Sequence, residues 1–135
     1  MPSKNFDEKI RVVASVIARD SKYLICQRPI HKRHGGLWEF PGGKIRDGES
    51  NFDAARRELG EELQVEVVGV GRRLFTAMDP DSPFSIEFFK VEIKGEIEAI
   101  EHTEARWCSV FEMTNFFFAP ADKRFVTEYL LKEVQ

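Results

Sequence analysis

Three glutamates, Glu58, Glu61 and Glu62, form the cluster in this sequence that is best suited to chemistry. On a helix, which advances about 100° per residue, steps of three and four residues place such side chains about 5–6 Å apart at Cβ. Like charges at this spacing destabilise a helix, and the repulsion grows where water is scarce. A divalent cation offsets it, because carboxylate oxygens suit Mg²⁺ and Mn²⁺. The alternative is a solvated surface helix, since glutamate is a good helix former.

The element that must position these glutamates is a helix predicted over residues 50–63. Ser50 is a good N-cap residue, and Asp53 three positions later completes a weak capping box. Apolar residues follow at helical spacing on one face: Phe52, Ala55, Leu59 and Leu63. Because this stripe lies about a quarter-turn from the carboxylates, we expect the glutamates at the edge of the buried face.

The segment around the glutamates has a recognisable pattern. Residues 43–65, GKIRDGESNFDAARRELGEELQV, match eight of the nine specified positions of G-x5-E-x7-R-E-U-x-E-E-x-G-U, where U is a bulky apolar residue. The chain therefore resembles the Nudix hydrolases, whose box this is. Gln64 replaces the family's glycine, which usually adopts a left-handed conformation as the chain leaves the helix. The turn geometry is thus in question, although Gln64 is no metal ligand and activity should persist.

The resemblance implies a fold and a chemistry. The fold is an α/β Nudix-type α/β/α sandwich with a mixed central sheet, and the reaction is hydrolysis of a nucleoside diphosphate linked to another group. Glu58, Glu61 and Glu62 would bind the metal, with a backbone carbonyl of the turn at Gly42 and Gly43. We expect Mg²⁺, with Mn²⁺ as a substitute. A bound cation neutralises phosphate charge and lowers the pKa of a bound water.

Two further box positions are expected to be structural. Arg57 borders the glutamates and could orient a carboxylate through a charge-assisted hydrogen bond. Glu49 either orients Arg57 or the loop, or is an exposed turn residue.

A second acidic position lies farther along the chain. The string Glu101-His102-x-x-x-x-Trp107 resembles an element that supplies another glutamate to the metal site in MutT-like relatives. Glu101 is the preferred candidate and Glu104 its competitor. The general base is one of these residues or a box glutamate, and His102 is expected to be a loop residue.

Residues 36–44, GLWEFPGGK, resemble the MutT-like branch of the family, the nucleoside triphosphate pyrophosphohydrolases. Members of this branch cleave between the α and β phosphates and release pyrophosphate. The resemblance points to substrate contacts from Glu39, Phe40 and Lys44. Arg28 and Arg33 are candidate phosphate clamps, with ordinary surface charge as the alternative.

Asp122 is the candidate for reading the base. It ends an Ala-Pro-Ala-Asp string that the family's cytidine triphosphate pyrophosphohydrolases share. An ionised aspartate only accepts hydrogen bonds, so it suits an exocyclic amine of cytosine or the adjacent donors of a guanine-type base. The alternative is an N-cap of the last helix. Of the neighbouring Phe116, Phe117 and Phe118, one could stack on a base, although core packing is expected for most of them and for Trp38.

The sequence therefore predicts a Mg²⁺-dependent enzyme that converts nucleoside triphosphates to monophosphates and pyrophosphate. Its expected substrates are cytidine nucleotides or oxidised deoxynucleotides such as 8-oxo-dGTP. The first alternative is hydrolysis of a sugar- or ribose-linked nucleoside diphosphate. The second, from a different class, is a non-catalytic nucleotide-binding Nudix module.

The remaining elements are predicted from periodicity and turn residues. Residues 10–18 and 23–27 should form a hairpin around a turn at residues 20–22. Residues 31–36, 41–43 and 79–83 should be loops or turns. Further extended segments are expected at residues 38–40, 65–70, 73–77, 84–93 and 105–108. A closing helix is expected at residues 122–133, with Phe125, Tyr129 and Leu130 facing the core.

Length and composition set the outer limits. The chain has 135 residues and 42% apolar residues, so a single domain over residues 1–135 is expected. A net charge of −3 makes nucleic-acid binding an unfavoured function. No apolar run reaches the ~20 residues of a membrane span, and the polar N-terminus lacks a signal core. Cys26 and Cys108 form no metal motif, so we expect a cytoplasmic protein without a structural zinc. A monomer or a homodimer is expected.

Overall fold

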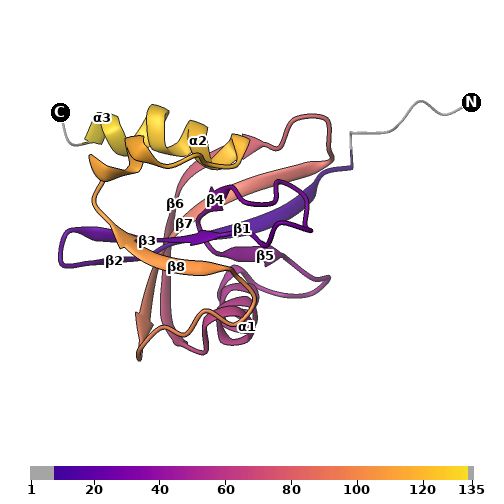
Figure 1. Ribbon diagram of the computed structural model, residues 1–135. Coiled ribbons are helices and arrows are strands. Elements are labelled where there is room, and N and C mark those ends of the chain that lie inside the picture. The colour runs from indigo at the N-terminus through magenta and orange to yellow at the C-terminus, as the bar shows by residue number, and fades with distance from the viewer. Residues whose placement is uncertain (1–7, 134–135) are drawn as a thin grey trace, which may run out of the picture.

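The computed structural model describes residues 8–133, and its strands lie between two helical layers (Figure 1). The first sheet has the order β5-β1-β7-β6. Its strands are β1 Ile10–Val16, β5 Gly42–Lys44, β6 Glu66–Met78 and β7 Phe84–Lys94. Strands β1 and β7 are parallel, whereas β5 and β6 pair antiparallel with their neighbours. The mixed sheet and the α/β sandwich are therefore confirmed.

A second, antiparallel sheet contributes Glu39 to the lining of the cleft described below. Its strands are β2 Ala18–Arg19, β3 Lys22–Gln27, β4 Trp38–Glu39 and β8 Glu104–Cys108, with β3 paired to the other three. The predicted hairpin of residues 10–18 and 23–27 is wrong in its pairing, because both edges of β1 are taken by β5 and β7. Only β2 pairs with β3 around Asp20 and Ser21, which have φ values of 53° and 63°. Such positive values are typical of tight hairpin turns.

Two other predicted boundaries differ from the structure. The strands expected at residues 65–70 and 73–77 are one strand, β6, whose pairing with β7 shifts register at Val67/Gly69, Val70/Arg73 and Arg73/Phe75. These irregularities let one long strand bend without ending. The turn expected at residues 41–43 is largely strand β5, because Gly42 and Gly43 pair with Ala14 and Val13 of β1.

Helix α1, Asn51–Leu63, follows the predicted course. The Ser50 side chain accepts a hydrogen bond from the Asp53 N–H at 3.0 Å, which confirms the N-cap. Gln64 ends the helix in the left-handed conformation, at φ 55° and ψ 39°, and its N–H donates to the Gly60 carbonyl. Glutamine thus takes the geometry that the family assigns to glycine, at a cost of about 1–2 kcal/mol.

The C-terminal layer is a chain of short helical segments. They are η1 Glu112–Asn115, α2 Pro120–Phe125, the π-helical η2 Val126–Leu130 and α3 Leu131–Glu133. The predicted start at residue 122 is two residues late, because Pro120 occupies the first turn, where a proline is well tolerated. The segment before α2 is joined to β4: Trp38 donates to the Phe117 carbonyl and accepts from the Ala119 N–H, both at 2.8 Å.

Two apolar cores lie between the helices and the strands. One core packs under α1 and contains Val13, Leu24, Leu59 and Leu63, together with Cys26. The other packs under α2 and η2 and contains Phe40, Phe88, Phe125 and Leu130, together with Cys108. Phe52, predicted on the buried face of α1, is instead 37% exposed at the start of the helix. Both cysteines are free and buried. Within residues 8–133, no helix combines the length and apolarity that crossing a membrane requires.

Candidate functional site

The first part of the site is the contact between α1 and β5. The Glu58 carboxylate lies so close to Gly43 that a Cβ at this position would overlap it. Gly43 is therefore required by packing, and any side chain there would displace the carboxylate from the β5 backbone. The Arg57 Nη1 group donates to Glu58 Oε1 at 2.6 Å, which fixes the carboxylate from its other side.

Arg57 connects α1 to the preceding loop. It donates to Glu49 through Nε at 2.7 Å and through Nη2 at 2.8 Å, and to the Lys44 carbonyl at 3.0 Å. The Arg46 N–H also donates to Glu49, at 2.8 Å. Arg57 foremost, and then this backbone bond, lower the pKa of Glu49 to about 2. The expected contact between Glu49 and Arg57 is present, and it joins the loop to the acidic edge of the helix.

Glu62 has the most buried side chain of the three clustered glutamates Glu58, Glu61 and Glu62. Its side chain is buried, with 4% of the residue exposed, and burial is the main reason that its pKa rises to about 10. A hydrogen bond with Glu58 and the charges of Glu39, Glu58 and Glu101 raise it further. Its Oε1 atom has no hydrogen-bond partner among residues 8–133. A buried carboxylate surrounded by carboxylates is stabilised by a proton or by a cation.

The other acidic candidates separate into two groups. Glu101 lines the cleft beside Glu62, whereas its competitor Glu104 lies on β8 and pairs with Arg106 at 2.7 Å. The side chain of Glu61 is 52% exposed, and it lies 3.4 Å from Arg57 rather than in the cleft lining.

The oxygen ligands that these glutamates offer suit a hard divalent cation, but the side chains do not converge on one point. Throughout the described part of the chain, no three Asp, Glu, His or Cys side chains converge as the ligands of a metal ion would. Glu58 and Glu61 instead bond to Arg57. The buried Glu62 oxygen without a partner and the close approach of Glu58 to Gly43 are the observations that fit a bound cation.

These carboxylates line a cleft of about 460 Å³. The cleft is assembled from β1, β4, β5, β7, α1 and the start of α2, together with loops that are far apart in the sequence. The predicted substrate residues that line it are Arg28, Arg33, Glu39, Phe40, Lys44 and Asp122. Glu58, Glu62, Glu101, Gly42 and Gly43 line it as well. A volume of this size is typical of a small-molecule site.

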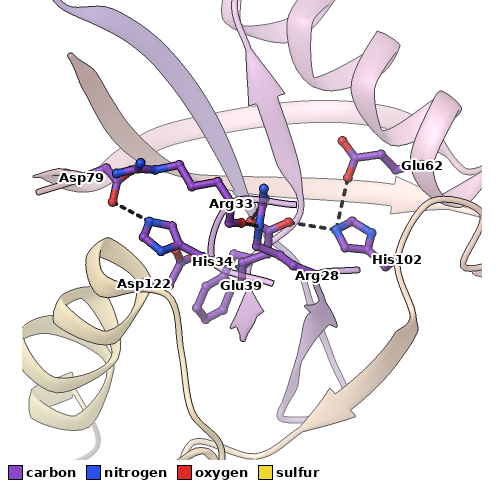
Figure 2. A network of polar contacts seen from close by, with 9 residues as sticks. Arg28, Arg33, His34, Glu39, Glu62, Asp79, His102 and Asp122 are labelled. Carbon is purple, nitrogen blue, oxygen red and sulfur yellow. Dashed lines mark hydrogen bonds and ion pairs between the residues drawn. The ribbon is translucent and has the colours of Figure 1, made fainter. Parts of the chain in front are cut away.

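A network of polar side chains runs across the cleft (Figure 2). Glu39 bonds to Arg28 Nη1 and to His102 Nε2, each at 2.9 Å, and the same His102 nitrogen lies 3.7 Å from Glu62 Oε1. His102 is in a loop, as expected, yet its side chain is only 5% exposed and it joins Glu39 to the glutamate cluster. The motif that contains Glu101 and His102 was the signal that could have placed this histidine in the site.

The network continues through three contacts that no sequence pattern indicates. Arg28 Nε donates to the Arg33 carbonyl at 2.6 Å, and Arg33 and His34 each contact the Asp79 carboxylate at 2.9 Å. The guanidinium groups of Arg28 and Arg33 are therefore paired with carboxylates. As a phosphate clamp, Arg33 would have to exchange Asp79 for the substrate.

Asp122 does not act as the N-cap of the last helix. Ala119 is the N-cap of α2, and Asp122 lies inside its first turn. The Asp122 Oδ2 atom accepts a hydrogen bond from the Phe40 N–H at 2.9 Å. Burial above all, and then the charge of Glu39, hold the pKa of Asp122 well above its usual range. Asp122 therefore faces the cleft beside two other predicted substrate residues.

The aromatic candidates divide between core and surface. Trp38 and Phe118 are each 8% exposed and belong to the core, whereas Phe117 is 81% exposed. Phe116 packs edge-on against Trp38 with ring centroids 5.1 Å apart. Lys44 lies with its Nζ atom 5.0 Å from the ring centroid of Phe84, which also lines the cleft.

Comparison with known sequences shows the family. A family model described as the NUDIX domain matches residues 9–129. The CTP pyrophosphohydrolase of Escherichia coli strain K12 is 40% identical over 116 residues, which cover 84% of this chain and 85% of the relative. A putative 8-oxo-dGTP diphosphatase 2 of Mycobacterium tuberculosis is 32% identical over 120 residues, or 87% of this chain and 85% of the relative.

Solved structures agree with the sequences. The solution structure of the E. coli ORF135 protein superposes with a TM-score of 0.78 at 36% identity, covering 93% of this chain and 91% of that one. A MutT structure, from work on Aliivibrio salmonicida and Vibrio cholerae, gives a TM-score of 0.77 at 32% identity, with 92% and 98% covered. Since sequence, fold and the glutamate-bearing helix agree over most of its length, the chain belongs to the Nudix hydrolase family.

Proposed function

We propose that this protein is a nucleoside triphosphate pyrophosphohydrolase that acts on cytidine nucleotides or on oxidised deoxynucleotides such as 8-oxo-dGTP. The observation that carries the proposal is the buried Glu62 side chain beside Glu58 at one end of the cleft, whose Oε1 atom has no hydrogen-bond partner among the described residues. The names of the relatives, a CTP pyrophosphohydrolase and 8-oxo-dGTP diphosphatases, support this choice of substrates.

Nudix hydrolases use a divalent metal ion, and Mg²⁺ is proposed here, with Mn²⁺ as a substitute. Glu58, Glu62 and Glu101 would hold it, with Glu61 approaching from the exposed edge and a backbone carbonyl of Gly42 or Gly43 from β5. Such an ion neutralises charge on the phosphates and activates water. Hard carboxylate and carbonyl oxygens are the ligands that it prefers.

The remaining residues of this end hold the acidic groups in place. Arg57 fixes Glu58 on one side and Glu49 on the other, so the carboxylate meets the substrate already oriented. Lys44, next to Gly43, is the proposed contact to the phosphate chain. One of the glutamates, Glu101 or a box residue, takes a proton from the attacking water. Orientation and electrostatic stabilisation are expected to supply most of the rate acceleration, as in other phosphoryl transfers.

The opposite end is proposed to bind the nucleoside. Asp122 and Glu39 would read the polar edge of the base, while Phe40 contributes to the wall of the cleft. Burial above all, and then the charge of Glu39, raise the pKa of Asp122, which favours the protonated form of its carboxyl group. A carboxylic acid both donates and accepts, which suits a base edge that presents an acceptor beside an amine.

The test is product identity. The purified protein is incubated with Mg²⁺ and CTP, dCTP, 8-oxo-dGTP, dGTP, a nucleoside diphosphate sugar and ADP-ribose, and both phosphate-containing products are measured. We expect pyrophosphate and a nucleoside monophosphate from a triphosphate, and about 10²–10³-fold slower release from Glu62→Gln protein prepared in parallel. Absence of pyrophosphate from every triphosphate contradicts the proposal. Cleavage of the sugar- or ribose-linked substrates alone would establish the alternative enzyme class.

A further inference from the structure

Asp79 joins two loops that both line the cleft. Arg33 donates to its Oδ2 atom and His34 contacts its Oδ1 atom, each at 2.9 Å, so both carboxylate oxygens are used. Arg33 also donates to the Pro80 carbonyl at 3.1 Å. We call this set of contacts the Asp79 clasp. It connects the loop of residues 29–36 to the loop of residues 79–83, which the chain separates by more than forty residues.

The Asp79 side of the clasp is fixed by its own backbone. The Asp79 N–H donates to the Phe84 carbonyl at 2.9 Å, and its carbonyl accepts from the Ser82 hydroxyl at 2.8 Å. The loop is further fixed to β1, because Ile10 donates to the Pro83 carbonyl at 2.8 Å. The position of the Asp79 carboxylate is therefore set by its own loop and does not depend on Arg33 and His34.

The loop of residues 29–36 is compact and braced at its base. The Gly36 N–H donates to the Arg28 carbonyl at 2.9 Å, and the Leu37 N–H donates to the His34 carbonyl at 3.1 Å. A Cβ on Gly35 would overlap the Ile30 carbonyl, so the glycine lets the turn close on itself. The loop is therefore expected to move as a unit, and its contact with Asp79 decides where that unit lies.

Burial makes the clasp more than a surface ion pair. The Asp79 side chain is 8% exposed, whereas Arg33 is 48% and His34 25% exposed. A buried carboxylate needs charged or hydrogen-bonding partners, and both of these side chains come from the loop. Because the Arg33 guanidinium is paired with Asp79, the Arg33 side chain does not extend into the cleft as a free cation.

The position of the clasp indicates which part of a substrate it faces. Figure 2 shows Asp79 and His34 on the side of the network near Asp122, and Glu62 and His102 on the other side. His34, Asp79 and Asp122 all line the cleft. The clasp therefore lies at the end that the nucleoside would occupy, away from the glutamates that would handle the phosphates.

We propose that Asp79 is a positioning residue that holds residues 29–36 closed against the nucleoside part of the substrate and so sets how tightly the nucleoside is bound. This inference rests on the proposed function, since it names the part of a nucleotide that the loop meets. Asp79 touches the loop and leaves the reacting atoms to the glutamates. Its loss should therefore weaken binding without slowing the chemical step.

The main variant is Asp79→Asn, which keeps the size of the side chain and removes its charge. The matched control is Asp81→Asn, an exposed carboxylate in the same loop whose φ of 59° asparagine also tolerates. Four quantities are measured for the triphosphate that the wild-type protein hydrolyses fastest. KM and the inhibition constant of the monophosphate product report binding of the nucleoside part, whereas kcat and the inhibition constant of pyrophosphate report the chemical step and the phosphate end. We expect KM and the product inhibition constant to rise together by about tenfold in Asp79→Asn. The kcat, the pyrophosphate inhibition and the control should stay near wild type.

A second measurement needs no turnover. Trypsin can cut after Lys32 and Arg33, and we expect cleavage there to be about tenfold faster in Asp79→Asn than in the wild type or in Asp81→Asn. Urea unfolding identifies a variant that simply fails to fold. In that case His34→Asn, which tolerates the φ of 58° at this position and keeps the Arg33 contact, should show the same pattern with a rise of about threefold.

The outcomes separate the inference from the proposed function. If no triphosphate is hydrolysed by the wild-type protein, the proposed function fails, and faster trypsin cleavage together with weaker binding of a nucleoside monophosphate would still support the role of Asp79. Wild-type values of KM and of trypsin cleavage in folded Asp79→Asn protein would overturn it. A loss of pyrophosphate inhibition with unchanged monophosphate inhibition would also overturn it, because the loop would then face the phosphates.

Discussion

The two ends of the cleft handle charge in opposite ways. At the α1 end, Glu58, Glu62 and Glu101 bring carboxyl groups together, and the buried Glu62 Oε1 atom has no hydrogen-bond partner within the described residues. At the Asp79 end, the carboxylate meets Arg33 and His34, and the charges neutralise each other. The proposed cation would complete the first arrangement, whereas the second is complete in the protein alone.

This difference separates chemistry from recognition. Groups that repel one another in the free protein gain most when a cation and a substrate arrive, so they can act on the reaction itself. Groups that already satisfy each other contribute a preformed wall, which mainly affects how well the substrate fits. Substitutions at the α1 end should therefore change kcat, and substitutions at the nucleoside end should change KM and the choice of base.

The largest expected effect is at Glu62. We expect Glu62→Gln to lower kcat by about 10²–10³-fold while the protein remains folded, because an amide cannot supply the anionic oxygen ligand that the proposed metal ion needs. Glu61→Gln is the matched comparison, since this side chain is half exposed and outside the cleft lining. Its kcat should fall less, by about tenfold. Steady-state rates at saturating Mg²⁺ test the pair, and equal losses would show that Glu61 turns into the cleft when the metal binds.

At the nucleoside end, Asp122→Asn should change selectivity more than turnover. An amide in place of the carboxyl group alters the donor and acceptor pattern offered to the base, and a bidentate contact of this kind discriminates by about 1–3 kcal/mol, or roughly tenfold or more. We expect the ratio of kcat/KM for CTP and for 8-oxo-dGTP to change by about that factor, with kcat on the better substrate within about threefold. An unchanged ratio would remove Asp122 from base recognition.

The pH dependence of stability sharpens the contrast at Glu62. Its pKa of about 10 in the folded metal-free protein exceeds the ordinary value of 4.5 for a free glutamate. Between these values the unfolded chain has lost a proton that the folded protein keeps, so this group makes stability fall as pH rises from about 5 toward 10. In EDTA, Glu62→Gln should be more stable than wild type by roughly 1–3 kcal/mol at pH 8 and by little at pH 4.5.

Urea unfolding at the two pH values measures this difference. Added Mg²⁺ should stabilise the wild type at pH 8 and have much less effect on Glu62→Gln. A difference that grows toward acidic pH would contradict the assignment, because it would mean that Glu62 is ionised in the folded protein.

The smallest effect concerns the end of α1. Gln64 is held at φ 55°, a conformation that glycine adopts without strain. Gln64→Gly should therefore raise the free energy of unfolding by about 0.5–1 kcal/mol, as measured by urea unfolding. The kcat should stay unchanged, because the side chain is exposed and lies outside the cleft lining. A loss of stability would show that Gln64 makes a contact worth more than the relief of strain.

The acidic end of the site was predictable because it is local in sequence. One continuous segment, from the glycine turn through the helix, contains Gly43, Arg57, Glu58 and Glu62. Helical spacing alone places the glutamates on one edge of the helix. Ser50 as N-cap and the mixed sheet were also predictable, and both are confirmed. The exposure of Glu61 was not, because it depends on where Arg57 draws that carboxylate.

The Asp79 end could not be predicted in the same way. Asp79 meets Arg33 and His34 only because two loops fold toward each other, and nothing near residue 79 in sequence marks such a contact. The pairing of β1 with β7 was missed for the same reason, since hydrophobic patterns show which residues are buried but do not name their neighbours. His102 lay within a recognised motif, yet its contact with Glu39 required the second sheet to be in place.

The pair of hydrogen bonds between Trp38 and the segment before α2 gives this protein an internal optical probe. Trp38 is buried where β4 meets Phe117 and Ala119, one residue before the Glu39 that faces the cleft. The sequence contains one other tryptophan, Trp107, which lies on β8. In a Trp107→Phe protein, the fluorescence emission of Trp38 would report directly whether the C-terminal helical layer is packed against β4.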